Sequence, residues 1–243
     1  ASMLEKSGVI EEVFDVAYKW LGRIPGGLAV ATVVASTVLA AMVGVIGAAV
    51  VTMALVALPS MLRRGYSPVL AVGTVMAGGT LGILIPPSVL AIVYGLVANQ
   101  SVGELYLGSV FPGLVLSGLY ILFSVGYALL NPKAAPRLSP EETPTWSERW
   151  RALRSIWSPL VLIFLVLGTI FLGLAAPTEA AAIGAFGAMV VAAIHRRLSW
   201  TILRLALEQT AKATAMVMWI VFGANAFVGF YIAQGGDRYV SEL

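Results

Sequence analysis

The residues that could bind a ligand lie in one uncharged stretch that offers backbone rather than side-chain chemistry. Gly78-Gly79-Thr80-Leu81-Gly82 is followed closely by Pro86-Pro87-Ser88. Proline removes an amide hydrogen, and the residue before a proline avoids helical angles. An unwound segment would leave carbonyl oxygens free for a cation and amides free for a carboxylate. We therefore predict a helix break within residues 78–88, between half-helices over about 67–77 and 88–98.

This break would lie at membrane depth. The uncharged run from Gly65 to Gly103 is well over the ~20 residues that cross a bilayer once. The chain is 59% hydrophobic and 11% charged, whereas soluble domains average about 25% charged residues, so we predict an integral membrane protein. Unwound backbone is tolerated in a membrane where protein buries it or where it lines a cavity. A kink that only shapes helix packing is the alternative interpretation.

A second pattern precedes the break. Residues 26–62 contain no charge, and two apolar arms, about 28–42 and 48–62, flank Gly44-Val45-Ile46-Gly47. Arms of ~15 residues rise only ~22 Å as helix, less than a ~30 Å hydrocarbon core. Because cations lie before and after the segment, we predict a re-entrant hairpin with its tip at Gly44–Gly47, open to the cytoplasmic side. A tight hairpin of two full spans is the alternative.

The remaining segments are expected to be helical too. Glu179 follows Pro177 where the first turn of a helix favours an acid. We divide the chain into four regions. Residues 1–25 form an amphipathic interfacial helix (helical over 8–24), and residues 26–130 hold the hairpin, the broken helix and a span at about 105–130 that is interrupted by Pro112-Gly113. Residues 131–155 form a proline- and arginine-rich cytoplasmic linker, and residues 156–243 hold spans at about 156–173, from Pro177 to His195, and, after a polar stretch, at about 213–233.

Charge sets the orientation. Most basic residues fall on one predicted side of the membrane, as do five tryptophans, whereas the turns near 99–105 and 172–179 carry no cation. This asymmetry places the basic side in the cytoplasm. The basic residues on that side are Lys19, Arg23, Arg63, Arg64, Lys133, Arg137, Arg149, Arg151, Arg154, Arg196, Arg197 and Arg204; the tryptophans are Trp20, Trp146, Trp150, Trp157 and Trp200. We expect no nucleic-acid partner.

Side chains suited to catalysis are scarce. The chain has no cysteine and one histidine, His195, which lies beside two arginines at the end of a span. No Ser/His/Asp set, paired intramembrane acids or metal-ligand cluster is visible, so we do not expect an enzyme. Carbonyl and hydroxyl oxygens suit a hard monovalent cation such as Na⁺, and helix N-termini suit a carboxylate. Glycines at these positions could equally serve close helix packing.

Four segments together resemble the large membrane subunit of the tripartite ATP-independent periplasmic (TRAP) transporters. Their order and spacing match over essentially the whole chain; they are Gly44–Val51, Leu58–Tyr66, Gly78–Ser88 and Ala176–Ala182. The resemblance implies an all-α, elevator-type transporter built of two inverted repeats, each with a re-entrant hairpin. Family members have spans before the start of this chain and a second hairpin after Leu243, so we expect a fragment with the first repeat and part of the second.

The resemblance also implies a function and partners. Such proteins are multi-pass permeases of the bacterial inner membrane that import organic acids, dicarboxylates in the archetype, on a sodium gradient. They work with a small membrane subunit and a periplasmic substrate-binding protein. We keep two alternatives: a two-hairpin sodium/carboxylate symporter that needs no binding protein, and a membrane scaffold that does not transport.

On this resemblance the hairpin tip and the unwound helix provide a sodium site and half of the substrate cavity. Many relatives carry serines at the tip where this chain has Ala48 and Ala49, which leaves carbonyl oxygens as ligands. The predicted cation ligands are Gly44, Gly47, Ala48, Gly78, Gly79, Thr80 and Gly82, and the predicted substrate residues are Pro86, Pro87 and Ser88. We expect no cofactor beyond Na⁺ as coupling ion. The tip and the break should touch, because each leaves backbone groups that lipid cannot satisfy.

Overall fold

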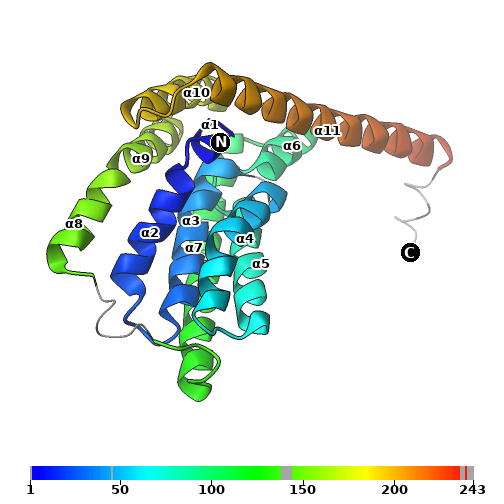
Figure 1. Cartoon of the computed structure of the whole chain (residues 1–243). Helices are drawn as coiled ribbons and strands as arrows, with labels where there is room; N and C mark the ends of the chain where they lie inside the picture. Colours follow the sequence, from blue (N-terminus) through cyan, green and yellow to red (C-terminus); the bar gives the residue numbers. More distant parts are fainter. Residues whose placement is uncertain (1, 45, 138–143, 236–238, 240–243) are drawn as a thin grey trace. The chain divides into compact units, whose positions relative to one another are not determined.

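The described part of the chain is helical and contains no strand in the computed structural model, which describes residues 2–44, 46–137, 144–235 and 239. It forms two compact units, Met3–Leu198 and Ser199–Leu243. The helices, labelled in Figure 1, are α1 (Ser2–Lys6), α2 (Val9–Leu21), α3 (Gly27–Val43), α4 (Ile46–Arg63), α5 (Pro68–Leu84), α6 (Val89–Ala98), α7 (Val102–Leu130), α8 (Trp146–Ser155), α9 (Trp157–Phe171), α10 (Pro177–Ile194) and α11 (Trp200–Ala233).

The architecture confirms an all-α polytopic membrane protein. Five candidate spans within the described residues are long and apolar enough to cross a bilayer: α4, α5 with α6 (Pro68–Ala98), α7, α10 and α11. α3 is apolar but shorter, with 17 residues. It is also the most buried helix in the first unit, because α2, α4, α5 and α7 all pack against it. The core therefore forms around the first arm of the predicted hairpin.

The predicted helical hairpin is present. α3 and α4 pack against each other and against α5 (Figure 1). The chain turns at Gly44, whose φ of 66° and ψ of 11° lie in the left-handed region that glycine enters without steric cost. The tip is shorter than predicted, because Gly47 already lies in the first turn of α4. Entry and return on one side of the membrane stay a prediction.

The discontinuous helix is also present, with its break within residues 78–88 as predicted, but the first half-helix runs past its predicted end at about residue 77. α5 continues through Gly78, Gly79 and Gly82 as far as Leu84, and only residues 85–88 separate it from α6. Glycine lowers helix stability by about 1 kcal/mol without ending a helix. The proline pair ends it: Ile85, before Pro86, has an extended backbone (φ −84°, ψ 120°). We call residues 85–88 the break.

Two other predicted boundaries are wrong. α7 runs continuously through Pro112, because a single proline removes one helical hydrogen bond and the surrounding turns persist. α11 is one helix from Trp200, so the polar stretch before residue 213 is helical and not a separate connection. In contrast, α2 buries its apolar face as predicted, and Glu179 lies in the first turn of α10, where its carboxylate accepts the Ala176 amide at 2.9 Å.

Candidate functional site at the hairpin tip and the helix break

The hairpin tip and the break touch, as predicted. The Val89 amide, the first of α6, donates to the carbonyl oxygen of Gly44 at 3.4 Å. The carbonyl oxygen of Pro87 occupies the position where a Cβ on Gly44 would lie. Gly44 is buried, so only a residue without a side chain fits between the tip and the break. We call this contact the junction.

Four helix ends meet within a few residues of the junction. α3 ends at Val43 and α5 at Leu84, whereas α4 begins at Ile46 and α6 at Val89. A helix carries a partial negative charge at its C-terminus and a partial positive charge at its N-terminus. The ends of α3 and α5 therefore favour a cation, and the starts of α4 and α6 favour an anion.

The proline pair leaves two carbonyl groups of α5 without their usual partners. In an α-helix each carbonyl oxygen accepts the amide four residues ahead, and the Leu81 oxygen does accept the Ile85 amide at 2.9 Å. For Gly82 and Ile83 the residues four ahead are Pro86 and Pro87, which have no amide hydrogen. Gly82 is thus the one residue of α5 predicted to bind a cation whose carbonyl oxygen has no amide four residues ahead to accept.

The start of α6 is closed by protein groups. The Ser88 hydroxyl accepts the Ala91 amide at 3.4 Å as an N-cap, and the Val89 amide is used by Gly44. The carbonyl oxygen of Ser88 accepts a hydrogen bond from the Tyr106 hydroxyl of α7 at 3.4 Å. Ser88 and Tyr106 are each only 1% exposed. Ser88, predicted to bind substrate, is therefore occupied with holding the break.

Tyr106 was not among the predicted site residues. Its ring lies in a small core with Ile170 and Ala180, so α7 packs there against α9 and α10. A tyrosine within an apolar span signals a need for a polar partner, because a buried hydroxyl is costly without one. That signal was available in the sequence, but the identity of the partner was not.

The start of α4 is open. Gly47 is exposed, and among the described residues beyond its chain neighbours and its own helix backbone, no heavy atom lies within 4 Å of the position that its Cβ would take. The first amides of a helix have no acceptor in their own helix. Gly47 and Ala48 were predicted as cation ligands through their carbonyl groups, but those groups point along α4 toward its next turn. Their amides point out of the helix end, which suits an anion.

The other predicted cation ligands have structural partners. A Cβ on Gly78 would collide with the Ser36 side chain of α3, and a Cβ on Gly79 with Val50 of α4. The Thr80 hydroxyl donates to the carbonyl oxygen of Ala77 at 2.7 Å and lies 3.2 Å from the Tyr120 hydroxyl. Gly78 and Gly79 thus allow α5 to pack closely against both hairpin arms. This is the alternative role, close helix packing, that the sequence also allowed for these glycines.

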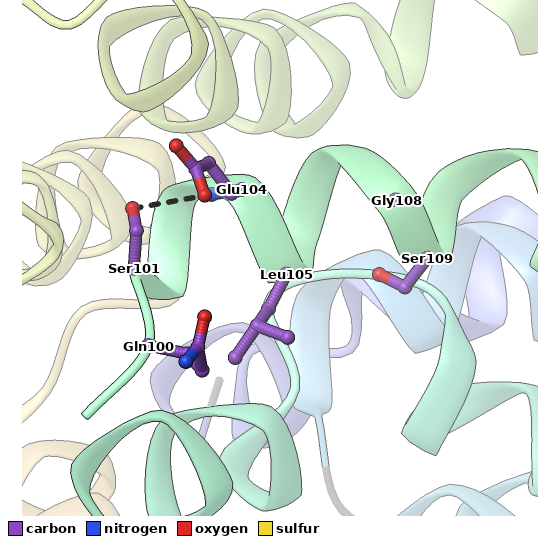
Figure 2. Close-up of a pocket in the computed structure, with 6 residues that line it drawn as sticks. All are labelled: Gln100, Ser101, Glu104, Leu105, Gly108 and Ser109. Atoms are coloured by element: carbon purple, nitrogen blue, oxygen red, sulfur yellow. Dashed lines mark hydrogen bonds between the residues drawn. The ribbon is translucent and has the colours of Figure 1, made fainter. Parts of the chain in front are cut away.

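A separate open pocket of about 380 Å³ lies at the turn between α6 and α7. Figure 2 shows its lining, in which the Glu104 amide donates to the Ser101 hydroxyl at 3.4 Å. No predicted site residue lines it; the lining residues are Gln100, Ser101, Glu104, Leu105, Gly108 and Ser109. It lies at an N-capped helix start on the surface, and none of the junction residues named above lines it.

Within the described residues, no group of three or more His, Asp or Glu side chains could hold a metal ion. Any cation at the junction would depend on backbone oxygens. Among known protein families, the model for "Tripartite ATP-independent periplasmic transporter, DctM component" matches residues 1–243.

The chain belongs to the DctM family.

Curated relatives of this DctM chain differ in substrate. It is 36% identical to the C4-dicarboxylate TRAP transporter large permease protein of Pseudomonas aeruginosa over 100% of this chain and 57% of the relative. It is 29% identical to the ectoine TRAP transporter large permease protein of Halomonas elongata, covering 93% and 52% of the two chains. It is 30% identical to the 2,3-diketo-L-gulonate TRAP transporter large permease protein of Escherichia coli, covering 99% and 56%.

The DctM chain therefore spans about half the length of the curated relatives it matches. Family membership and the five apolar spans make it a multi-pass protein of the inner membrane. The match to the family model includes both the hairpin tip and the break.

Proposed function

We propose that this DctM segment forms one cation site and part of the substrate cavity of a sodium-coupled large permease that imports organic acids. The observation that carries the proposal is the contact between Gly44 and the break, which brings together two helix C-termini and two helix N-termini. Broken helices of transporters use such ends for ions and for anionic substrates.

The cation would bind to carbonyl oxygens at the ends of α3 and α5. Gly82 and Ile83 offer oxygens that the proline pair leaves without amides, and Gly44 has a second lone pair beyond the one used by Val89. This set replaces Gly78 and Gly79, whose carbonyl groups lie inside the regular part of α5. A cation there would offset the partial negative charge of both helix ends.

The carboxylate of the substrate would bind at the start of α4. Gly47 in its first turn is exposed with open space at its Cβ position, whereas the first amides of α6 are largely used. A cation near the ends of α3 and α5 would favour a carboxylate nearby through Coulomb attraction, which is strong in a medium of low dielectric constant. This attraction is a physical route to coupling sodium entry to substrate entry.

The proposed partners follow from the family and its relatives. A tripartite system implies a small membrane subunit and a periplasmic substrate-binding protein besides the large permease. One relative, the isethionate TRAP transporter permease protein of Oleidesulfovibrio alaskensis, matches 90% of this chain over 34% of its own length. Relatives are named for C4-dicarboxylates, ectoine, isethionate and 2,3-diketo-L-gulonate, and we propose an organic acid as substrate.

Sodium binding can be tested on the 243-residue chain. We expect sodium chloride to raise the Tm of the detergent-purified chain above its value in equimolar potassium chloride, because an ion that binds the folded state stabilises it. At sodium concentrations of ten times Kd the expected gain is about 1.4 kcal/mol. Equal Tm values in the two salts, at every concentration up to molar, would contradict the cation site.

Substrate binding at the start of α4 can be tested by uptake. In a complete permease that contains this segment, assayed with its two partners, Gly47→Val should abolish sodium-driven uptake, because the side chain would cover the amides of the first turn. The matched control is Gly73→Val, since Gly73 is also exposed, helical and free of neighbours within 4 Å of its Cβ position. Normal uptake in both variants would remove α4 from the site.

A further inference from the structure

Three tryptophans form a cluster far along the chain from the junction residues. The ring of Trp20, in α2, lies 5.7 Å from that of Trp146 and 5.9 Å from that of Trp150, and the latter two are 6.1 Å apart. The indole N–H of Trp20 donates to the carbonyl oxygen of Arg149 at 3.3 Å. These contacts hold α8 against α2. We call Trp20, Trp146 and Trp150, with the exposed face of α8, the tryptophan corner.

The tryptophan corner keeps much of its aromatic surface exposed. Trp146 is 62% and Trp150 53% exposed, and Trp157 at the start of α9 is 69% exposed. Ala152 and Ile156, on the other side of this segment, are buried. α8 therefore uses its small apolar residues for packing and leaves large amphipathic rings on the surface.

Arginines lie beside these rings. Arg151 and Arg154 are exposed, and Trp150 and Arg154 are four residues apart, so they share one face of α8. The one acid of α8, Glu148, is held at the helix start, where it accepts the Thr145 amide at 2.7 Å. This hydrogen bond lowers the pKa of Glu148. The side chain is thus anchored as a cap, and the face beyond it is positively charged and aromatic.

The position of the corner in the fold identifies what meets it. α8 ends at Ser155, and α9, an apolar helix, begins at Trp157 with a bend of 47° between the two. We expect the bilayer to begin at α9, which would place the exposed rings at the depth that tryptophan prefers. Basic side chains at this depth face lipid phosphates, and anionic lipids enrich the negative charge there.

We propose that the tryptophan corner is a binding surface for anionic phospholipid headgroups. The rings of Trp146 and Trp150 lie among the headgroups, and Arg151 and Arg154 bind their phosphates. Because α2 packs on α3, the bound lipid layer anchors the helix that supports the first arm of the hairpin. An acidic peptide of another protein would share the phosphate-like charge, but it would not account for exposed rings next to an apolar span.

The test is tryptophan quenching by brominated lipids. The purified 243-residue chain is titrated in detergent with brominated phosphatidylglycerol or brominated phosphatidylcholine, and the difference between wild type and Trp146→Phe/Trp150→Phe isolates the two rings. We expect half-maximal quenching at a concentration of phosphatidylglycerol about 25-fold lower than of phosphatidylcholine, from roughly fivefold for each of the two arginines. Arg151→Gln/Arg154→Gln should remove that preference.

The control variant Arg204→Gln/Lys212→Gln removes two exposed charges from α11 and should keep the preference. Equal quenching by the two lipids in the wild type, or an unchanged preference in Arg151→Gln/Arg154→Gln, would overturn the proposal. So would loss of the preference on adding soluble polyglutamate at micromolar concentration, because that result would identify an acidic peptide as the occupant.

Discussion

The helices α4 and α6 both begin at the junction, yet their first turns are used differently. In α6 the Val89 amide donates to Gly44 and the Ala91 amide to the Ser88 hydroxyl, and Tyr106 holds the Ser88 carbonyl oxygen. In α4 the first turn carries Gly47, exposed and without neighbours. One helix start is closed by the protein and the other is open.

This difference assigns separate tasks to the two starts. Hydrogen bonds from three elements hold the start of α6, and one of them joins it to the tip. The start of α4 keeps the electrostatic character of a helix N-terminus without an internal acceptor. A substrate carboxylate is therefore expected at α4, whereas α6 provides the rigid support that keeps the tip in position. The following substitutions test this division, from the largest expected effect to the smallest.

Replacing the residue that joins the two regions should cost the most. In Gly44→Ala the methyl group collides with the carbonyl oxygen of Pro87, and alanine must adopt a left-handed backbone. We expect a loss of about 2–4 kcal/mol in folding stability from strain and overpacking together, measured as a lower Tm in detergent. A Tm equal to that of the wild type would mean that the tip and the break are not in contact.

Removing the support of α6 should have an intermediate effect. Tyr106→Phe removes one of the two donors to the buried carbonyl oxygen of Ser88, which keeps the Ile92 amide at 3.3 Å, so we expect a cost of about 0.5–1.5 kcal/mol. Tyr120→Phe is the matched control, because its hydroxyl contact is with Thr80, whose side chain is exposed. Thermal unfolding of both variants should give a lower Tm for Tyr106→Phe, and the reverse order would mean that α6 does not depend on this hydrogen bond.

The smallest effect on stability is expected at the open start. Gly47→Ala adds a methyl group to open space within a helix, where alanine is favoured over glycine by up to ~1 kcal/mol. The Tm should therefore stay constant or rise slightly, in contrast to Gly44→Ala three residues earlier. A drop in Tm comparable to that of Gly44→Ala would show that the start of α4 is packed and cannot receive a substrate.

Several parts of the site could be predicted because the chemistry is local. Pro86 and Pro87 lack amide hydrogens wherever they occur, so a helix break near them follows from the sequence. Gly44 lies between two uncharged apolar arms, and this pattern predicted a turn at a residue that can adopt turn conformations. The contact between tip and break was also predictable, since both leave polar backbone groups that a membrane interior cannot satisfy.

The roles of the other glycines were decided by the tertiary structure. The sequence pattern around Gly78 and Gly79 is the same whether these glycines break a helix or let a neighbouring helix pack closely. Which of the two occurs depends on the side chains that contact them. Those are Ser36 and Val50, which lie dozens of residues away in the chain. Helix packing compensates the low helix propensity of glycine, so α5 continues to the prolines.

The sequence by itself determined that this chain is an all-helical membrane protein with a glycine turn and a proline break, because hydropathy, charge asymmetry and missing amide hydrogens are properties of the residues. Only the tertiary structure decided which helix start is open. The partners that close α6 are Gly44 at the end of α3, whose carbonyl oxygen accepts the Val89 amide, and Tyr106 of α7, whose hydroxyl donates to the Ser88 carbonyl oxygen. No local pattern specifies partners so distant in sequence. The free first turn of α4 is defined by the absence of such neighbours around Gly47.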